Sequence, residues 1–278
     1  MPISYPAPAK LNLFLHVVGR RPDGYHLLQS VFRFVDYGDT LRFAIRNGSA
    51  VTRSNPIAGL PPEQDLCVRA ARLLQAHTGC SRGVDITLDK KLPLGGGLGG
   101  GSSDAATTLL ALNRLWDLRL SRTELQTLAL QLGADVPVFV FGESAFAEGV
   151  GEQLQPISLP PAWYVVLTPP VQVATAAIFA SPRLTRDTIP IKMSDFSAGL
   201  VRNDLEPVVC ETYPVVAEYL SWLKQFGDAR MTGSGACVFA EFATQQAALE
   251  VFAERPQQMQ GFVARGLDRH PLHDFAQQ

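Results

Sequence analysis

The stretch KLPLGGGLGGGSSDAAT, residues 91–107, places six glycines in the seven positions from Gly95 to Gly101, directly before a helix-forming run. Glycine has no Cβ, so it adopts positive φ readily and lets backbone N–H groups approach a ligand closely. The N-terminus of the following helix adds unpaired N–H donors and the positive end of the helix dipole. These features predict a phosphate-binding loop. A flexible hinge is the alternative, and it is disfavoured because ordering so many glycines costs much backbone entropy.

The spacing within the glycine run distinguishes this loop from three common phosphate motifs. Gly95, Gly97 and Gly100 match G-x-G-x-x-G, but a Rossmann unit needs a following strand with an acidic end, and a second helix is expected here instead. The run does not end in Gly-Lys-Ser/Thr as a P-loop does. The V-A-I-K, H-R-D and D-F-G motifs of protein kinases are absent from the sequence. The run closes on two serines, and we predict a nucleoside triphosphate as its ligand.

Outward from the loop, the N-terminal half of the chain combines strands and helices. Residues 9–18, AKLNLFLHVV, alternate strictly, which predicts a strand with Lys10 and Asn12 on one face near its start. A Pro-Asp-Gly turn follows within residues 20–26. Periodicity and end signals predict two strands within 31–45 around Gly38, a strand over 84–92, and helices over 61–79, 103–116 and 121–133, the last opened by a Ser121/Glu124 capping box.

The order of the expected strands and helices changes beyond residue 152. A buried strand is expected over 162–170, a glycine turn and strand over 229–242, and helices around 173–181, 207–226 and 245–254. We therefore place a domain boundary near residue 153, which gives domains 1–153 and 154–278. Because strands and helices do not follow a regular βαβ order, the predicted class is α+β with two lobes.

The overall composition is that of an ordinary globular protein. The chain has 278 residues, 46% of them hydrophobic and 18% charged, and its net charge of −2 gives no strong attraction to nucleic acid or acidic membranes. No apolar run approaches the roughly 18 residues of a membrane span, and the N-terminus lacks a signal-peptide pattern. The four cysteines are scattered without metal-binding spacing, so we expect a cytoplasmic protein. We further expect a monomer or weak homodimer that binds a small molecule and neither nucleic acid nor membrane.

Two charged residues next to apolar stretches are candidates for catalysis. Asp135 precedes the run VPVFVF, where a carboxylate is either the N-cap of a helix or a general base, and both roles are compatible. Lys10 lies between apolar flanks, and the alternative to a functional role is a solvated lysine at a strand edge. His270 and His273 form an H-x-x-H pattern around a proline, which we interpret as a pair of surface histidines.

Four stretches of the sequence resemble the GHMP kinase superfamily. PLGGGLGGGSSDAA (93–106) resembles its phosphate-binding motif, and MTGSGACVFAEF (231–242) its C-terminal glycine motif. Two further stretches point to a particular group within this superfamily: PAPAKLNLFLHVVGRRPDGYH (6–26) and GADVPVFVFG (133–142). The resemblance runs over nearly the whole chain and is weakest over 183–199. The resemblance implies a two-domain GHMP-kinase fold. Its N-terminal domain is ribosomal-S5-like α/β with a left-handed βαβ unit, and its C-terminal domain is ferredoxin-like.

The narrower resemblance is to family members that phosphorylate a cytidine diphosphate-linked methylerythritol in the non-mevalonate isoprenoid route, with ATP and Mg²⁺. It implies that Asp135 is the base and that Lys10 keeps it ionised and polarises the acceptor hydroxyl. It implies ATP contacts from Pro93, Leu94, Gly95, Gly96, Gly97, Leu98, Gly99, Gly100, Gly101, Ser102, Ser103, Asp65, Leu66 and Lys90. It implies substrate contacts from Asn12, Tyr25, His26, Phe32, Thr175 and Phe179.

The sequence also allows other roles for the serines of the loop and other functions for the chain. Ser102 and Ser103 either contact Mg²⁺ or cap the following helix, and we predict no protein metal ligand. A kinase for another small alcohol, such as mevalonate or homoserine, is disfavoured by GRRPDGYH (19–26). A nucleotide-binding protein without catalysis is disfavoured by the presence of both Lys10 and Asp135. Tyr25 and His26 follow a turn, where we expect both to be exposed.

Overall fold

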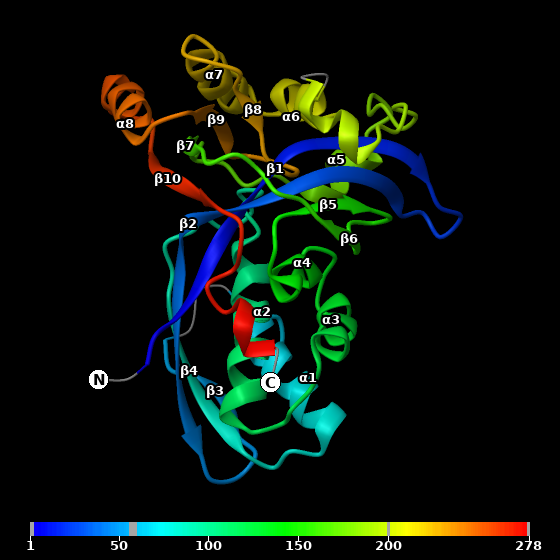
Figure 1. The fold of residues 1–278 in the computed structure, drawn as a ribbon, viewed down its shortest axis with the longest axis vertical. Helices are drawn as coiled ribbons and strands as arrows, with labels where there is room; N and C mark the ends of the chain where they lie inside the picture. The colour runs from blue at the N-terminus through cyan, green and yellow to red at the C-terminus, as the bar shows by residue number, and fades with distance from the viewer. Residues whose placement is uncertain (1–2, 56–59, 199–200, 277–278) are drawn as a thin grey trace.

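Two long antiparallel strands run through the computed structural model, which describes residues 3–55, 60–198 and 201–276. Strand β1 spans Tyr5–Arg20 and strand β2 spans His26–Arg46, and the predicted Pro-Asp-Gly turn joins them. Figure 1 shows this hairpin reaching from the end of the molecule that holds the N-terminal helices to the end that holds the C-terminal helices. The hairpin therefore connects both halves of the fold.

The expectation of two strands around Gly38 is wrong, because β2 continues through this glycine without a turn. Gly38 lies opposite Pro8 of β1, just before the register shifts between Pro8 and Lys10. A Cβ at Gly38 would lie 2.2 Å from the Ala7 carbonyl oxygen, so glycine is needed for the two backbones to approach this closely. This glycine marks a close backbone approach and not the end of a strand.

The N-terminal sheet extends from β2. Strand β4 (Gly83–Asp89) pairs antiparallel with β2, and β3 (Val51–Arg53) pairs parallel with β4. Strand β5 (Ala145–Glu148) pairs with another part of β2, and β6 (Gln153–Pro156) pairs with β5. Four helices lie on one side of this sheet (Figure 1): α1 (Leu66–Thr78), α2 (Gly100–Leu115), α3 (Arg122–Leu130) and α4 (Val136–Phe141).

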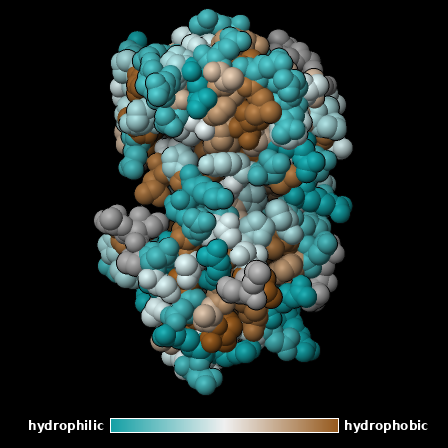
Figure 2. All heavy atoms as spheres, turned by 90° about the vertical axis from the view of Figure 1, so that its left-hand side faces the viewer, coloured by the Kyte–Doolittle hydropathy of each residue, from teal (hydrophilic) through white to brown (hydrophobic). Residues whose placement is uncertain are grey.

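Helix α2 forms the centre of the N-terminal core. Ala105, Leu109 and Leu112 are fully buried, as is most of the helix, which packs against α1, α4 and β1. The side of the molecule turned away from these helices faces the viewer in Figure 2, where hydrophobic residues form separate patches within a largely hydrophilic surface. The sheet thus buries one face against helices, as antiparallel sheets commonly do.

Some helix ends follow the predicted signals and others do not. The helix expected to close on Gly133 already ends at Leu130. The helix expected over 207–226 is divided into two, Glu206–Thr212 and Pro214–Leu223, because Tyr213, which precedes a proline, is not helical. Ser121 forms a reciprocal capping box with Glu124 at the start of α3, and Gly79 ends α1 in the left-handed conformation. Helix α1, expected to begin near residue 61, begins only at Leu66. The reason is that the Asp65 side chain accepts hydrogen bonds from two N–H groups of the first turn and caps the helix there.

The C-terminal half forms a second antiparallel sheet. Strand β7 (Trp163–Leu167) pairs with β9 (Val238–Phe242) and β10 (Gly261–Leu267), and β8 (Arg230–Met231) pairs with β9. Strand β10 also pairs with β2 and so links the two sheets. The helices here are α5 (Thr175–Ala180), α6 (Glu206–Thr212), α7 (Pro214–Leu223) and α8 (Gln245–Glu254), with short 3₁₀ helices over Met193–Ala198 and His273–Ala276. Over the described ranges, no helix has both the length and the apolar character needed to cross a bilayer.

The C-terminal tail folds back onto the N-terminal half, so the interpretation of two histidines as surface residues is wrong. His270 is 2% exposed and His273 is 7% exposed. His270 packs edge-on against the rings of Phe34 and Phe139, and burial lowers its pKa to about 3. Arg122 fixes the tail by donating hydrogen bonds to the His273 carbonyl oxygen and to the last carbonyl groups of α4. The tail is therefore part of the core that supports α4.

Candidate active site

The glycine loop runs from the end of β4 to the start of α2 and is held on two sides. The Lys10 N–H donates to the Leu98 carbonyl oxygen at 3.0 Å, which ties the loop to β1. On the other side, the Cys237 N–H donates to the Gly96 carbonyl oxygen at 3.1 Å. Three glycines of the loop have positive φ, a conformation that favours glycine. The loop is therefore an ordered element between β1 and the turn that precedes β9.

Gly97 is required by packing within the protein, whatever the loop binds. Its φ is +75°, and a Cβ at this position would lie 2.2 Å from the Thr232 carbonyl oxygen. The Thr232 hydroxyl also donates to the Gly97 carbonyl oxygen at 3.4 Å. The C-terminal glycine motif (231–242) thus forms one wall of the loop, which brings two distant glycine-rich stretches of the sequence together.

The start of α2 fits an anion such as phosphate. Gly99 occupies the N-cap position, and no side chain in the described part of the protein caps the helix. The first-turn N–H groups are therefore available to a ligand. Ser103 is fully buried and its hydroxyl donates to the Pro8 carbonyl oxygen at 2.7 Å, so it neither caps the helix nor faces the site. Ser102 lines the cavity described below.

Lys10 lies at the centre of the site, and its side chain is only 2% exposed. Its Nζ lies 2.5 Å from Asn12 Oδ1, 3.2 Å from the Gly97 carbonyl oxygen and 3.3 Å from Asp135 Oδ2. An ammonium group has three donors, so each has an acceptor. Gly99 leaves room for the side-chain stem, since a Cβ there would lie 3.1 Å from Lys10 Cγ and Cε. Lys10 is thus a buried link between β1, the loop and the start of α4, and not a solvated edge residue.

Asp135 occupies the N-cap position of α4, but its side chain does not act as a cap. Within the described residues its carboxylate makes no capping hydrogen bond. The carboxylate instead faces Lys10, and 42% of the side chain is exposed where it lines the cavity. Val136 and Pro137, which follow directly, are buried and hold the position fixed. The Asp135 carboxylate is therefore available to a ligand.

Asn12 is held by hydrogen bonds that no local sequence signal predicted. Asn12 Nδ2 donates to Ser30 Oγ at 2.7 Å, and Ser30 Oγ donates to the Phe14 carbonyl oxygen at 2.6 Å. The Asn12 N–H donates to Thr232 Oγ1 at 2.9 Å. Asn203 Nδ2 donates to the carbonyl oxygens on both sides of Thr232, each at 2.8 Å. These partners come from distant parts of the chain, so only the fold reveals them.

These groups open into a cavity of about 720 Å³. Both predicted catalytic residues, every predicted substrate residue and one serine of the loop line it: Lys10, Asp135, Asn12, Tyr25, His26, Phe32, Thr175, Phe179 and Ser102. Phe32 is 3% exposed, and the Lys10 Nζ lies 5.3 Å from its ring centroid. Arg20, Ser30 and Ser234 also line the cavity and were not predicted.

One part of the cavity wall is aromatic. Tyr25 is 63% exposed, as expected just after a turn. His26 is only 8% exposed, which corrects the expectation of an exposed pair. It is buried because it begins β2 and packs against Phe179, with ring centroids 5.0 Å apart at an interplanar angle of 30°. Thr175 shares a hydrogen bond with Ser234 at 2.7 Å, which holds the start of α5 against the C-terminal glycine motif.

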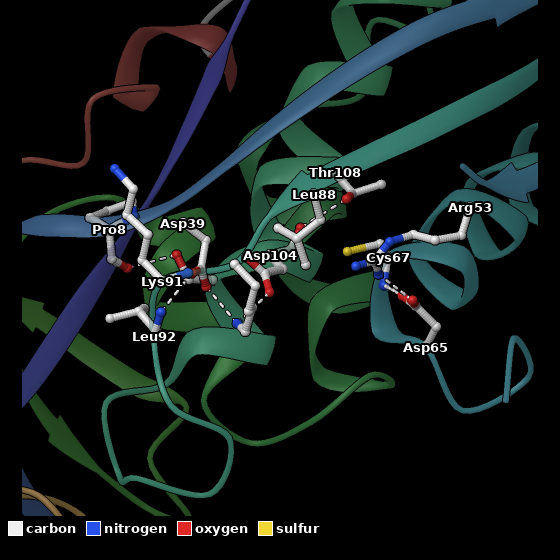
Figure 3. A network of polar contacts seen from close by, with 12 residues as sticks. Pro8, Asp39, Arg53, Asp65, Cys67, Leu88, Lys91, Leu92, Asp104 and Thr108 are labelled. Atoms are coloured by element: carbon white, nitrogen blue, oxygen red, sulfur yellow. Dashed lines mark hydrogen bonds and ion pairs between the residues drawn. The ribbon is translucent and has the colours of Figure 1, made fainter. Parts of the chain in front are cut away.

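Lys90 lies between two carboxylates at the base of the loop. Its Nζ donates to Asp39 Oδ2 at 2.5 Å and to Asp104 Oδ2 at 2.8 Å. Asp39 Oδ1 also accepts hydrogen bonds from the N–H groups of Lys91 and Leu92, at 2.6 and 2.8 Å, and Figure 3 shows Asp39 beside these two residues. This network fastens the start of the loop to α2, so the Lys90 ammonium already has two partners.

Asp104 is the most perturbed carboxyl group of this network. It is 3% exposed, and its Oδ1 has no hydrogen-bond partner in the part of the chain that the structure describes. Burial raises the pKa of Asp104 to about 7, although the neighbouring Lys90 acts to lower it. Asp104 therefore carries a proton for part of the time near neutral pH.

Asp65, predicted to contact the nucleotide, is engaged within the protein. Its carboxylate accepts a hydrogen bond from the Cys67 N–H at 2.9 Å and forms an ion pair with Arg53 (Figure 3). Leu66 beside it is half-buried, and Leu94 on the loop is 45% exposed. The nucleotide contacts of Asp65, Leu66 and Lys90 stay predictions.

Known proteins resemble this chain in both of its halves. The family described as GHMP kinases N terminal domain matches residues 65–143, and GHMP kinases C terminal matches residues 187–260. A 4-diphosphocytidyl-2-C-methyl-D-erythritol kinase from Thiobacillus denitrificans is 66% identical over 272 residues, which cover 98% of this chain and 98% of that protein. The chain belongs to the 4-diphosphocytidyl-2-C-methyl-D-erythritol kinase family. A second member, from Nitrosospira multiformis, is 64% identical over a region that covers 99% of this chain and 95% of that protein.

A solved member of this kinase family shares the fold. The crystal structure of a 4-(cytidine 5'-diphospho)-2C-methyl-D-erythritol kinase is 32% identical, with a TM-score of 0.77 over 95% of this chain and 99% of that one. The resemblance inferred from the sequence is confirmed, as is the two-domain GHMP-kinase fold. As a member of the 4-diphosphocytidyl-2-C-methyl-D-erythritol kinase family, the chain is a kinase, an enzyme class for which ATP is the phosphoryl donor.

Proposed function

We propose that this kinase transfers the γ-phosphoryl group of ATP to the 2-hydroxyl of 4-diphosphocytidyl-2-C-methyl-D-erythritol, a step of non-mevalonate isoprenoid synthesis. The names of its relatives support this substrate. One observation carries the proposal: a single cavity is lined both by Lys10 and Asp135 and by the aromatic residues Tyr25, His26 and Phe179. A substrate with a polyol at one end and a pyrimidine at the other matches a cavity with both kinds of wall.

Asp135 is the proposed general base. Its carboxylate accepts the proton of the acceptor hydroxyl as the hydroxyl oxygen attacks the γ-phosphorus, while the bond from that phosphorus to the bridging oxygen of the leaving ADP breaks. The position of Lys10 Nζ, 3.3 Å from Asp135 Oδ2, supports a role in offsetting negative charge beside the hydroxyl. Asn12 donates one N–H of its amide to Ser30, which leaves the second N–H to bind the polyol.

The glycine loop and the start of α2 are the proposed site for the ATP phosphates. The first-turn N–H groups of α2 and the Ser102 hydroxyl would donate to phosphate oxygens, and the uncapped helix start supports this role. Mg²⁺ bound with ATP would neutralise charge on those oxygens. We assign residues 1–153 to the domain that supplies the loop and 154–278 to the second domain. We also place the reaction in the cytoplasm, in keeping with the four unpaired cysteines of the described chain.

A coupled assay of ADP release against a panel of alcohols tests the proposal. The panel contains 4-diphosphocytidyl-2-C-methyl-D-erythritol, the free methylerythritol phosphate, mevalonate and homoserine. We expect turnover with the cytidyl substrate and at most traces with the others, because only that substrate has a base for the aromatic wall. Faster turnover with mevalonate or homoserine would refute the assignment, and ADP binding without any turnover would favour a non-catalytic nucleotide-binding protein.

A further inference from the structure

Arg186 connects two residues of the aromatic wall. It lies in the segment 183–199, which resembles the family least, and no sequence pattern marked it. Its Nε donates to His26 Nε2 at 3.1 Å. Its Nη2 donates to the carbonyl oxygens of Phe179 and Ser181, at 2.9 and 2.7 Å, and its Nη1 donates to that of Leu184 at 3.1 Å. One guanidinium thus holds the His26 ring and the C-terminal end of α5, which carries Phe179.

This contact determines where the proton of the His26 ring lies. A guanidinium has donors and no acceptor, so His26 Nε2 accepts through its lone pair. A neutral imidazole carries a single N–H, which must then be at Nδ1. Burial, with the positive charges of Arg186 and Arg20, lowers the pKa of His26, so the ring stays neutral near pH 7. No residue of the described chain is hydrogen-bonded to Nδ1, and His26 lines the cavity.

We propose that Arg186 is a positioning residue that makes the site selective for cytosine, because it fixes His26 as a donor through Nδ1–H. This inference rests on the proposed function. Cytosine has a lone pair at N3, which accepts such a donor, whereas uracil has a hydrogen at N3, so that two donors would oppose each other. A polar site that is left unpaired in this way discriminates strongly between similar ligands. The same guanidinium fixes the spacing of the His26 and Phe179 rings through the end of α5.

The tautomer of His26 is measurable on the wild-type protein. We expect the ¹⁵N resonances of the ring to show a protonated Nδ1 and an unprotonated Nε2 at pH 7, with assignment by a His26→Gln variant. In Arg186→Met, the Nε2–H tautomer becomes populated, because the donor that required a lone pair there is gone. A wild-type ring protonated at Nε2 would overturn the inference without any variant.

Kinetics test the selectivity. For Arg186→Met we expect KM for the cytidyl substrate to rise about 3- to 10-fold, the usual range for one lost hydrogen bond. The ratio of kcat/KM for cytidyl over uridyl substrate falls by the same factor, while kcat and KM for ATP stay unchanged. Arg183→Met is the matched control, since it removes an equal charge three residues away that forms an exposed ion pair with Glu211. It should leave all of these constants unchanged.

The outcomes separate this inference from the proposed function. If Arg186→Met folds and keeps the wild-type preference for cytidyl over uridyl substrate, the inference is refuted while the proposed function stands. If the wild type phosphorylates no cytidyl substrate, the proposed function fails, and the selectivity assignment fails with it. If Arg186→Met does not fold, the wild-type tautomer together with Arg186→Lys decides. Lysine keeps the positive charge but not the planar fork, so a lower cytidyl preference that accompanies a shift to the Nε2–H tautomer supports the inference. A wild-type preference in a variant whose His26 is protonated at Nε2 refutes it.

Discussion

At the scale of single residues, the site depends on a buried cation whose donors are all used. Lys10 Nζ reaches acceptors in β1, in the glycine loop and at the start of α4. A buried charge is tolerated when it is paired and hydrogen-bonded in this way. Because the three acceptors come from separate segments, Lys10 also fixes the distance between the phosphate loop and Asp135. We therefore expect any substitution of Lys10 to disturb both.

Tyr25 provides a prediction at this scale. Its ring is largely exposed in the cavity, so its removal costs little packing. Tyr25→Ala should raise KM for the cytidyl substrate about 10-fold or more, since stacking on a base is worth about 1–3 kcal/mol, and should leave KM for ATP unchanged. Tyr25→Phe keeps the ring and should keep most of the affinity. A drop in melting temperature with unchanged KM would mean that Tyr25 serves packing and not binding.

The buried carboxyl group of Asp104 makes the folding stability depend on pH. Its pKa is raised to about 7 in the folded protein and is about 3.9 in an unfolded chain. The folded state therefore binds this proton more tightly, so the stability it contributes is complete below about pH 4 and is lost as pH rises to about 7. Urea unfolding at pH 5 and pH 8 should show a larger loss of stability in the wild type than in Asp104→Asn. Equal losses in both proteins would contradict the raised pKa.

Many residues of the site could be predicted from the sequence, but their burial and their hydrogen-bond partners could not. Lys10 and Asp135 are candidates through local sequence patterns, whereas the substrate contacts of the aromatic residues follow from the resemblance to the kinase family. The burial of His26 and the engagement of Asp65 with Arg53 could not be predicted, since both depend on contacts with other elements. Arg186 lies 160 positions from His26, so no local pattern joins them.

At the scale of elements, the glycine loop is shaped by its neighbours. In Gly97→Ala, the new Cβ would meet the Thr232 carbonyl oxygen at 2.2 Å, and positive φ adds strain of about 1–2 kcal/mol. We expect a lower melting temperature together with weaker ATP binding. Gly101→Ala is the control for the melting temperature, because a Cβ there lies 3.4 Å from Leu66 Cδ1 and alanine favours the helix. Wild-type stability in Gly97→Ala would contradict the packing described for the loop.

Most elements could be predicted from periodicity, and the errors have physical reasons. Helix α8 and the capping box of α3 match the sequence signals, because those signals act within a few residues. The expectation of a strand break at Gly38 is wrong, because glycine is needed there for the close approach of the β1 backbone. Sequence periodicity does not reveal such close approaches, nor does it reveal that the tail with His270 returns to the core.

At the scale of the whole molecule, the cavity is built from both halves of the chain. The N-terminal half supplies Lys10, Asp135 and Ser102, and the C-terminal half supplies Phe179, Gly233 and Ser234. The β1–β2 hairpin connects them, as Figure 1 shows. Neither half holds a complete set of groups, so the proposed chemistry requires the two halves to keep their relative position.

General-base catalysis by Asp135 is tested by the turnover number of Asp135→Asn, measured by coupled ADP release with ATP and the cytidyl substrate both saturating. Asparagine keeps the shape of the side chain and removes the proton acceptor. We expect a fall in kcat of about 10²-fold or more, the scale of a lost general base, with dissociation constants for ATP and the cytidyl substrate close to those of the wild type. A kcat near that of the wild type would refute the role of Asp135 as general base and leave it with a structural role at the start of α4.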